Sequence, residues 1–205
     1  GRSLPTIGRI TLTAWHARHA NRAGFSRPGR VSLFCDEFTN YTDSAIGLKA
    51  VRLLNALGYE VVIPTHAESG RAQLSKGLVR AARKHATRNV ELLAPLVTAT
   101  SPLIGIEPSA ILGFRDEYPD LVPEALRQSS RSLAGNALLI EEFLGQEIEC
   151  GRIRAESFHA QPRRIFLHGH CHQKALSSLA PVIRALELPA GYEVTVIPSG
   201  CCGMA

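Results

Sequence analysis

The sequence lacks any apolar run that approaches the ~20 consecutive residues needed to cross a bilayer, and its first residues lack the apolar core of a signal peptide. Aromatic residues are not interleaved with the scattered arginines, as they are on many nucleic-acid-binding surfaces. We therefore expect a cytoplasmic protein with no transmembrane segment and no nucleic-acid partner. Its basic surface suits an acidic partner or peripheral contact with the inner membrane face.

Cysteine is also scarce, with five residues in a chain of 205. An odd number in a chain of this length does not indicate a disulfide framework. In a reducing compartment, clustered cysteines more often bind metals or take part in redox chemistry. The length fits one large domain or two small ones and permits a substantial core.

A repeat is the most informative feature that the chain does have. GYEVVIPTHAESG spans residues 58–70, and GYEVTVIPSGCCG spans residues 191–203. Both segments begin with the same four residues, and the same number of residues leads from there to the last glycine, so the two align without a gap. The repeat predicts one supersecondary unit built twice. The residues directly before the last glycine differ: Glu68 and Ser69 in the first copy, Cys201 and Cys202 in the second.

A short apolar run ending in a cysteine precedes each copy of the repeat. VSLFC ends at Cys35, and IFLHGHC ends at Cys171. A helical stretch follows each run before the GYEV sequence begins. We therefore match Cys35 with Cys171 and expect cysteines at matching points to serve a common type of site.

Apolar periodicity predicts strands that alternate with helices. This order is typical of an α/β fold with duplicated Rossmann-like βαβ units, whose parallel strands are flanked by helices. Proline cannot lie inside an intact helix, so we expect a helix to restart with Pro181 in its first turn. The expected strands are 31–35, 60–63, 103–107, 164–168 and 194–197; the expected helices are 44–57, one from Ser75, two after Pro123 split near Gly135, and the pair around Pro181.

Composition divides the chain into four parts. The first part is polar and arginine-rich, and we expect a linker or arm there, with Trp15 docking on the body of the protein. The expected parts are 1–30 as this arm, 31–122 as a first, degenerate repeat, 123–163 as a helical connection and 164–205 as a second repeat.

The predicted topology places the thiols together. Ligands of open α/β sheets bind beyond the carboxyl ends of the strands. Cys35 ends the first strand, Cys171 follows the fourth, and Cys201 and Cys202 follow the fifth, so we expect all four on one sheet edge. Cys150 lies outside the pattern and is interpreted as an ordinary thiol. Thiolates bind soft metals and iron–sulfur clusters.

Other interpretations of these residues stay open. His168, His170 and His172 share one face if they continue the strand, and they can bind zinc there. A cysteine–histidine nucleophile is a further interpretation, although no third orienting group is evident. The thiols can also be buried loop cysteines, and Cys35 alone is typical of a core thiol.

Five motifs within residues 31–205 resemble the cysteine-rich CCG domain: FCDEFTNY, ESGRAQLSKG, EPSAILGFRDEY, HGHCHQKAL and SGCCGMA. This family includes iron–sulfur subunits of anaerobic glycerol-3-phosphate dehydrogenase, glycolate oxidase and heterodisulfide reductase. It also includes the C-terminal part of FAD-linked D-lactate or 2-hydroxyacid dehydrogenases, which the last two motifs resemble most.

The resemblance implies a [4Fe–4S]-type cluster on Cys171, Cys201 and Cys202. The first set of ligands departs from the family pattern, since only Cys35 remains and Ala110 stands at a later cysteine position. We expect the chain to be part of a larger oxidoreductase that oxidises a 2-hydroxyacid such as D-lactate or glycolate, and to transfer electrons with no catalytic side chain of its own. The additional candidate metal ligands are Cys35, His170 and His172.

The same resemblance implies partners that this sequence does not contain. These are an FAD-bearing flavin domain or subunit, a ferredoxin-like module with CxxC spacing, and an electron acceptor. Two alternatives remain. One is a zinc-binding structural or interaction domain that uses the same cysteines with a histidine. The other is a scaffold that docks the flavin partner and carries vestigial thiols.

Overall fold

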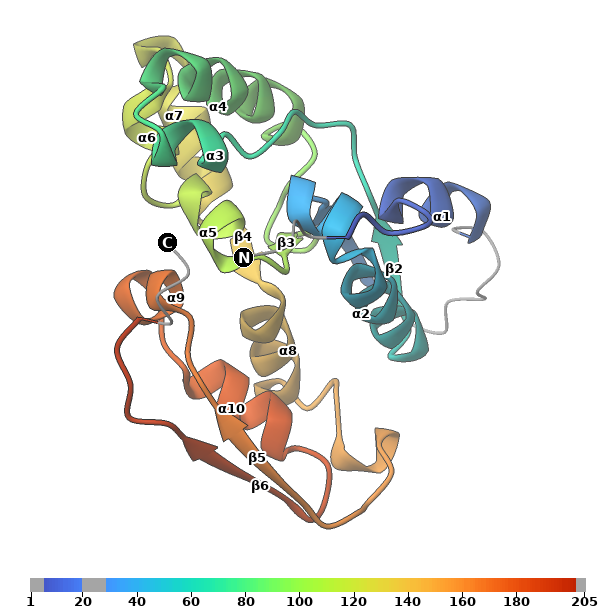
Figure 1. The fold of residues 1–205 in the computed structure, drawn as a ribbon. Helices are drawn as coiled ribbons and strands as arrows, with labels where there is room; N and C mark the ends of the chain where they lie inside the picture. The colour runs from blue at the N-terminus through green and yellow to red at the C-terminus, as the bar shows by residue number, and fades with distance from the viewer. Residues whose placement is uncertain (1–5, 20–28, 202–205) are drawn as a thin grey trace. The chain divides into compact units, whose positions relative to one another are not determined.

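The computed structural model describes residues 6–19 and 29–201, and the chain divides into two compact units, Gly1–Ala137 and Leu138–Ala205 (Figure 1). Parallel strands flanked by helices occur in both units, which confirms the predicted α/β class. Cys202 lies outside the described residues.

The first unit is built on a buried central strand, β1 (Gly29–Phe34), whose last four residues are buried. It pairs in parallel with β2 (Tyr59–Val62) on one side and with β3 (Leu103–Gly105) on the other. The sheet order is β2-β1-β3-β4, and one unit passes into the next within β4 (Ala137–Leu139). Strands of parallel sheets are commonly buried on both faces, and the burial of residues 31–34 fits this rule.

Helices pack against strands of this sheet. α2 (Ser44–Ala56) packs against β2 through its buried stripe, as its periodicity predicts. α1 (Leu12–His19) lies within the predicted arm, and the guanidinium of Arg52 sits 5.6 Å from the Trp15 ring centroid. The expected docking of Trp15 is therefore confirmed. The other elements are η1 (Phe38–Thr42), α3 (Arg71–Ser75), α4 (Val79–Leu93), α5 (Pro108–Ile111), η2 (Leu112–Phe114), α6 (Tyr118–Leu121) and α7 (Glu124–Ala134).

The second unit contains a two-stranded parallel sheet made of β5 (Arg163–Leu167) and β6 (Tyr192–Val196). α10 (Ala180–Glu187) packs against β6 and against α8 (Ile140–Glu149), as Figure 1 shows. Pro181 lies in the first turn of α10, where its missing N–H costs no hydrogen bond, as predicted. The remaining elements are η3 (Ala155–Ser157) and α9 (Cys171–Leu176).

Three expectations about the fold are wrong. The strands form two sheets rather than one, so Cys35 and Cys171 do not follow strands of a single sheet edge. No long helix starts at Ser75, because α3 ends there and Gly77 adopts a positive φ of 71° before α4 begins. The short strand β4 was not expected between the two helices after Pro123.

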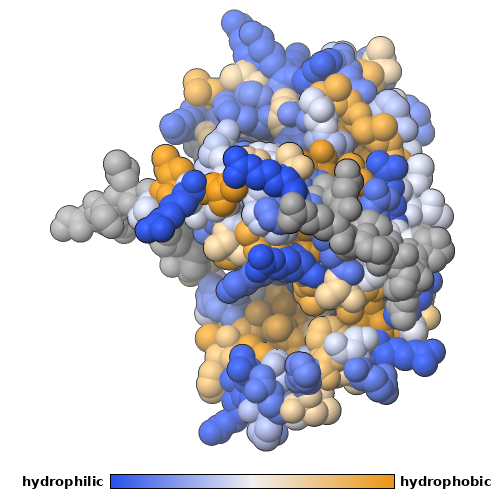
Figure 2. All heavy atoms as spheres, turned by 90° about the vertical axis from the view of Figure 1, so that its right-hand side faces the viewer, coloured by the Kyte–Doolittle hydropathy of each residue, from blue (hydrophilic) through white to orange (hydrophobic). Residues whose placement is uncertain are grey.

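In the described part of the chain, no helix is both long and apolar enough to cross a membrane. On the face shown in Figure 2, hydrophilic and hydrophobic residues are intermixed.

Candidate functional site

The repeat seen in the sequence corresponds to two parallel strand pairs that have the same arrangement. Tyr59 lies opposite Gly29 in the β1–β2 pair, and Tyr192 lies opposite Arg163 in the β5–β6 pair. A glycine with positive φ precedes each tyrosine, at 92° in the first copy and 86° in the second. The two GYEV segments therefore start their strands in the same way and in matching register.

This register changes which residue matches Cys171. Gly29 of β1 and Arg163 of β5 occupy the same position, so residues at equal distances after them correspond. Cys171 therefore corresponds to Glu37, and Cys35 corresponds to Gly169. Glu37 and Cys171 are each the first helical residue after their strand. The match between Cys35 and Cys171 is thus wrong: it aligned two residues of the same type, whereas the backbone aligns positions two residues apart.

Helix capping supports the new alignment independently. The Asp36 carboxylate accepts a hydrogen bond from the backbone N–H of Phe38 at 2.9 Å. At the corresponding place, Nδ1 of His170 accepts one from the backbone N–H of His172 at 3.2 Å. The residue before the first helical position caps the turn in both copies.

In the first unit, the side chains at the positions that match Cys171 and Cys202 touch. Ser69 occupies the place of Cys202 in the repeat, and its Oγ donates to Oε1 of Glu37 at 2.6 Å. The backbone N–H of Ser69 donates to Oε2 of Glu37 at 3.1 Å, and Ser69 is only 3% exposed. The loop after β2 and the turn after β1 therefore bring these two positions together.

Buried polar residues hold this loop in place. Asn89, which is fully buried, donates to the carbonyl of Glu68 and to Oη of Tyr118, both at 2.9 Å. Tyr118 in turn donates to the carbonyl of Ser69 at 2.8 Å, and burial raises the pKa of this phenol. Sequence reasoning missed Glu37, Asn89 and Tyr118. A polar Asn within the apolar face of α4 was the only signal for one of them.

Cys35 is buried, so its surroundings differ from those of an exposed metal ligand. It is 4% exposed, and burial together with the neighbouring Asp36 carboxylate raises the pKa of its thiol to about 12. The thiol therefore stays protonated at neutral pH. Since the thiolate is the form that binds metals, this environment does not favour Cys35 as a ligand.

A cavity of about 410 Å³ adjoins these residues of the first unit, and Cys35, Glu37 and Glu68 contribute to its wall. His66 also lines it, and burial lowers the pKa of its imidazole. The ring accepts from the backbone N–H of Cys35 at Nε2 (3.3 Å), so Nδ1 carries the proton and donates to the carbonyl of Ala67 (2.7 Å). Both ring nitrogens are thus engaged by backbone groups.

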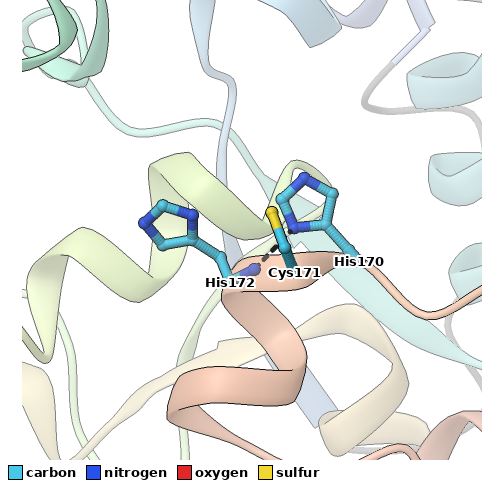
Figure 3. A group of neighbouring side chains, drawn as sticks. All are labelled: His170, Cys171 and His172. Carbon is cyan, nitrogen blue, oxygen red and sulfur yellow. Dashed lines mark hydrogen bonds between the residues drawn. The ribbon is translucent and has the colours of Figure 1, made fainter. Parts of the chain in front are cut away.

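In the second unit, His170, Cys171 and His172 form a cluster at the start of α9 (Figure 3). One potential ligand atom from each lies within 4.8 Å of the others. Because Nδ1 of His170 accepts the capping hydrogen bond, that ring can approach a metal only through Nε2. Among the described residues, the cluster includes neither His168 nor Cys201. The three histidines do not continue the strand, as the alternative zinc interpretation supposed, because β5 ends at Leu167.

The loop before the thiol pair lies against α9. Nζ of Lys174 donates to the carbonyls of Ser199 (2.9 Å) and Gly200 (2.8 Å). Cys201 follows directly and is exposed. The structure therefore brings the chain before the thiol pair to the helix that begins with Cys171.

Thiols and imidazoles are the donors found here, and they suit soft and borderline metals such as iron in sulfur clusters and zinc. Among the described residues, the donors that lie together are the Cys171 thiol and the imidazoles of His170 and His172. A [4Fe–4S] cluster takes four ligands from cysteine, so Cys171 can supply one of them and the others must come from outside this group. The same thiol and imidazoles also suit zinc.

Comparison with known proteins finds relatives among dehydrogenases. The chain is 28% identical over 180 residues to D-2-hydroxyglutarate dehydrogenase of Pantoea ananatis (strain AJ13355), covering 87% of this chain and 17% of the relative. It is 28% identical over 171 residues to D-2-hydroxyglutarate dehydrogenase of Escherichia coli (strain K12), covering 83% and 16%. It is 26% identical over 206 residues to a subunit of anaerobic glycerol-3-phosphate dehydrogenase of the same strain, covering 100% and 50%.

No protein-family model and no solved structure matches the chain. The chain spans half or less of the length of these relatives. It is therefore similar to a part of larger dehydrogenases, as an oxidoreductase-associated domain would be.

Proposed function

We propose that this chain is an electron-transfer domain whose Cys171, Cys201 and Cys202 hold an iron–sulfur cluster of the [4Fe–4S] type. The observation that carries the proposal is the contact between Glu37 and Ser69. These residues stand at the places of Cys171 and Cys202 in a repeat whose register and capping agree. The same backbone path in the second unit would bring two thiols together where the first unit brings a carboxylate and a hydroxyl.

The roles of the side chains follow from this placement. Cys171, Cys201 and Cys202 supply thiolates, and His170 fixes the turn from which Cys171 projects. When bound, a cluster supplies a one-electron carrier. Its reduction potential depends on hydrogen bonds to the sulfurs and on solvent exposure, which the protein controls through this turn and the loop after β6.

Anaerobic reconstitution of the full-length protein with iron and sulfide tests the proposal. We expect iron and acid-labile sulfide in comparable amounts, visible charge-transfer absorption and a paramagnetic signal on reduction. Cys171→Ser and Cys201→Ser should each reduce the bound iron, whereas Cys150→Ser, an exposed cysteine outside the repeat, should not. Equal loading of all three variants would contradict the assignment.

A zinc site is the second candidate, and the proximity of two imidazoles to the Cys171 thiol favours it. Zinc commonly takes mixed cysteine and histidine ligands. Elemental analysis of the protein as purified separates the two functions. Stoichiometric zinc without sulfide, lost on His172→Ala, would support the zinc domain and count against the cluster.

For the larger protein we propose oxidation of a 2-hydroxyacid at an FAD carried on another domain or subunit. Electrons would pass through a ferredoxin-like module and this domain to an acceptor, in the cytoplasm or at the inner membrane face. The matched relatives are named for D-2-hydroxyglutarate and glycerol-3-phosphate. A substrate panel of D-lactate, glycolate, D-2-hydroxyglutarate and glycerol-3-phosphate, with dye reduction as the readout, tests the class. Turnover of glycerol-3-phosphate alone would contradict it.

A further inference from the structure

Lys174 is the described side chain that ties the loop after β6 to α9. Its Nζ donates to two consecutive carbonyls, those of Ser199 and Gly200. Both acceptors belong to the backbone directly before the thiol pair, and Lys174 lies one helical turn after Cys171. One ammonium group therefore links the helix that starts with one candidate ligand to the loop that carries the other two.

The first unit shows how much support such a loop receives. There, Asn89 and Tyr118 donate to the carbonyls of Glu68 and Ser69 and hold the loop from outside the repeat. The position of Lys174 is occupied in the first unit by Asn40, which accepts from Thr13 instead. The lysine clamp is thus a feature of the second copy, in which the loop carries thiols.

Strand pairing alone does not fix this loop. The last backbone hydrogen bond from the end of β6 joins the N–H of Ile197 to the carbonyl of Leu167 at 2.8 Å. From there the backbone passes through Pro198 and reaches Gly200, whose missing side chain adds freedom. The two hydrogen bonds from Lys174 act on this segment, and hydrogen bonds from a charged donor are stronger than neutral ones.

We propose that Lys174 is a positioning residue that holds the loop directly before the thiol pair against the helix that begins with Cys171, before any metal binds. This inference rests on the proposed function, since it concerns the same thiols. It adds that the site is preorganised by one lysine in the metal-free protein. Preorganisation of this kind lowers the cost of ordering ligands when the metal arrives.

Thiol proximity in the metal-free protein tests the inference without relying on activity. The full-length protein is prepared with Cys150→Ser and Cys201→Ser, so that the pair formed by Cys171 and Cys202 can be followed without competition from a neighbouring thiol. After removal of metal with a chelator, diamide is added, and the disulfide between Cys171 and Cys202 is followed over time by mass spectrometry. A disulfide forms readily only when the two residues can approach closely.

In this background we expect Lys174→Met to slow formation of the disulfide roughly tenfold, because the effective concentration of the loop thiol falls. Lys174→Arg, which keeps a charged donor, should restore most of the rate. Arg184→Met is the matched control: it removes a positive charge from the same unit, where Arg184 pairs with Glu149 at 2.5 Å, and it should leave the rate unchanged. Circular dichroism checks that all variants keep their fold.

The outcomes separate the two proposals. An unchanged rate in Lys174→Met would overturn the role of Lys174 and leave the thiol site standing. Failure of the parent protein to form the disulfide would mean that the two thiols do not converge. That result would overturn both the proposed site and the clamp.

Discussion

The hydrogen bond between Ser69 and Glu37 is the observation that carries the proposed function, and its strength can be measured. In Ser69→Ala, Glu37 loses a partner at 2.6 Å, and the backbone N–H of Arg71 loses its acceptor at 3.1 Å. Hydrogen bonds to charged groups contribute about 1.5–3 kcal/mol, and an unsatisfied buried group adds to the cost of losing one. We therefore expect Ser69→Ala to lower the free energy of unfolding of the first unit by about 2–3 kcal/mol.

Urea denaturation followed by fluorescence reports on this unit, because its Trp15 is the single tryptophan of the chain. A double-mutant cycle with Glu37→Ala isolates the pairwise term, which we expect at about 1–2 kcal/mol. Ser75→Ala, an exposed serine at the end of α3, serves as the control and should change stability by less than about 0.5 kcal/mol. A coupling energy near zero would show that the two side chains do not interact, and it would remove the observation that carries the proposed function.

Three further predictions concern other parts of the two units. Burial raises the pKa of Asp36 from 3.8 to about 6. Between these pH values the folded state therefore binds more protons than the unfolded state. The free energy of unfolding should fall by on the order of 2–3 kcal/mol as pH rises from about 4 to 6. Asp36→Asn should reduce this pH dependence of the free energy of unfolding, as urea titrations at several pH values can show. Alkylation by iodoacetamide at pH 8 should modify exposed Cys150 readily and leave Cys35 unmodified until the protein unfolds, as peptide mass spectrometry can show; rapid native labelling of Cys35 would disprove its burial. Gly58→Ala and Gly191→Ala should each lower stability by about 1 kcal/mol, because both glycines have positive φ; thermal melts that leave either variant unchanged would argue against the shared turn.

Much of the fold could be predicted from the sequence because its signals are local. Apolar runs bounded by turn residues marked β1, β2, β5 and β6, and Pro181 marked the start of α10. The strand β4 was not predicted, because three apolar residues between two helices show no periodicity of their own. The division of the strands between two sheets depends on long-range pairing, which no local signal encodes.

The sequence marked candidate residues of the site, but it did not give the register that relates the two copies of the repeat. The thiols of the second copy stood out, and the repeat pointed to their partners in the first. Glu37 was overlooked because Cys35, two positions earlier, was matched with Cys171 on residue type alone. The pairing of Gly29 with Tyr59 and of Arg163 with Tyr192, supported by the matching helix caps, showed which positions correspond. The hydrogen bonds from Lys174 to the loop could not be predicted from the sequence either, because their acceptors are backbone carbonyls.

The most direct test of the shared thiol site is the iron bound per chain after anaerobic reconstitution of two cysteine variants of the full-length protein. We predict that Cys202→Ser loses most of its iron and sulfide, whereas Cys35→Ser, which removes the buried thiol of the first unit, retains them. Iron that is retained in Cys202→Ser, or lost in Cys35→Ser, would contradict the proposed site.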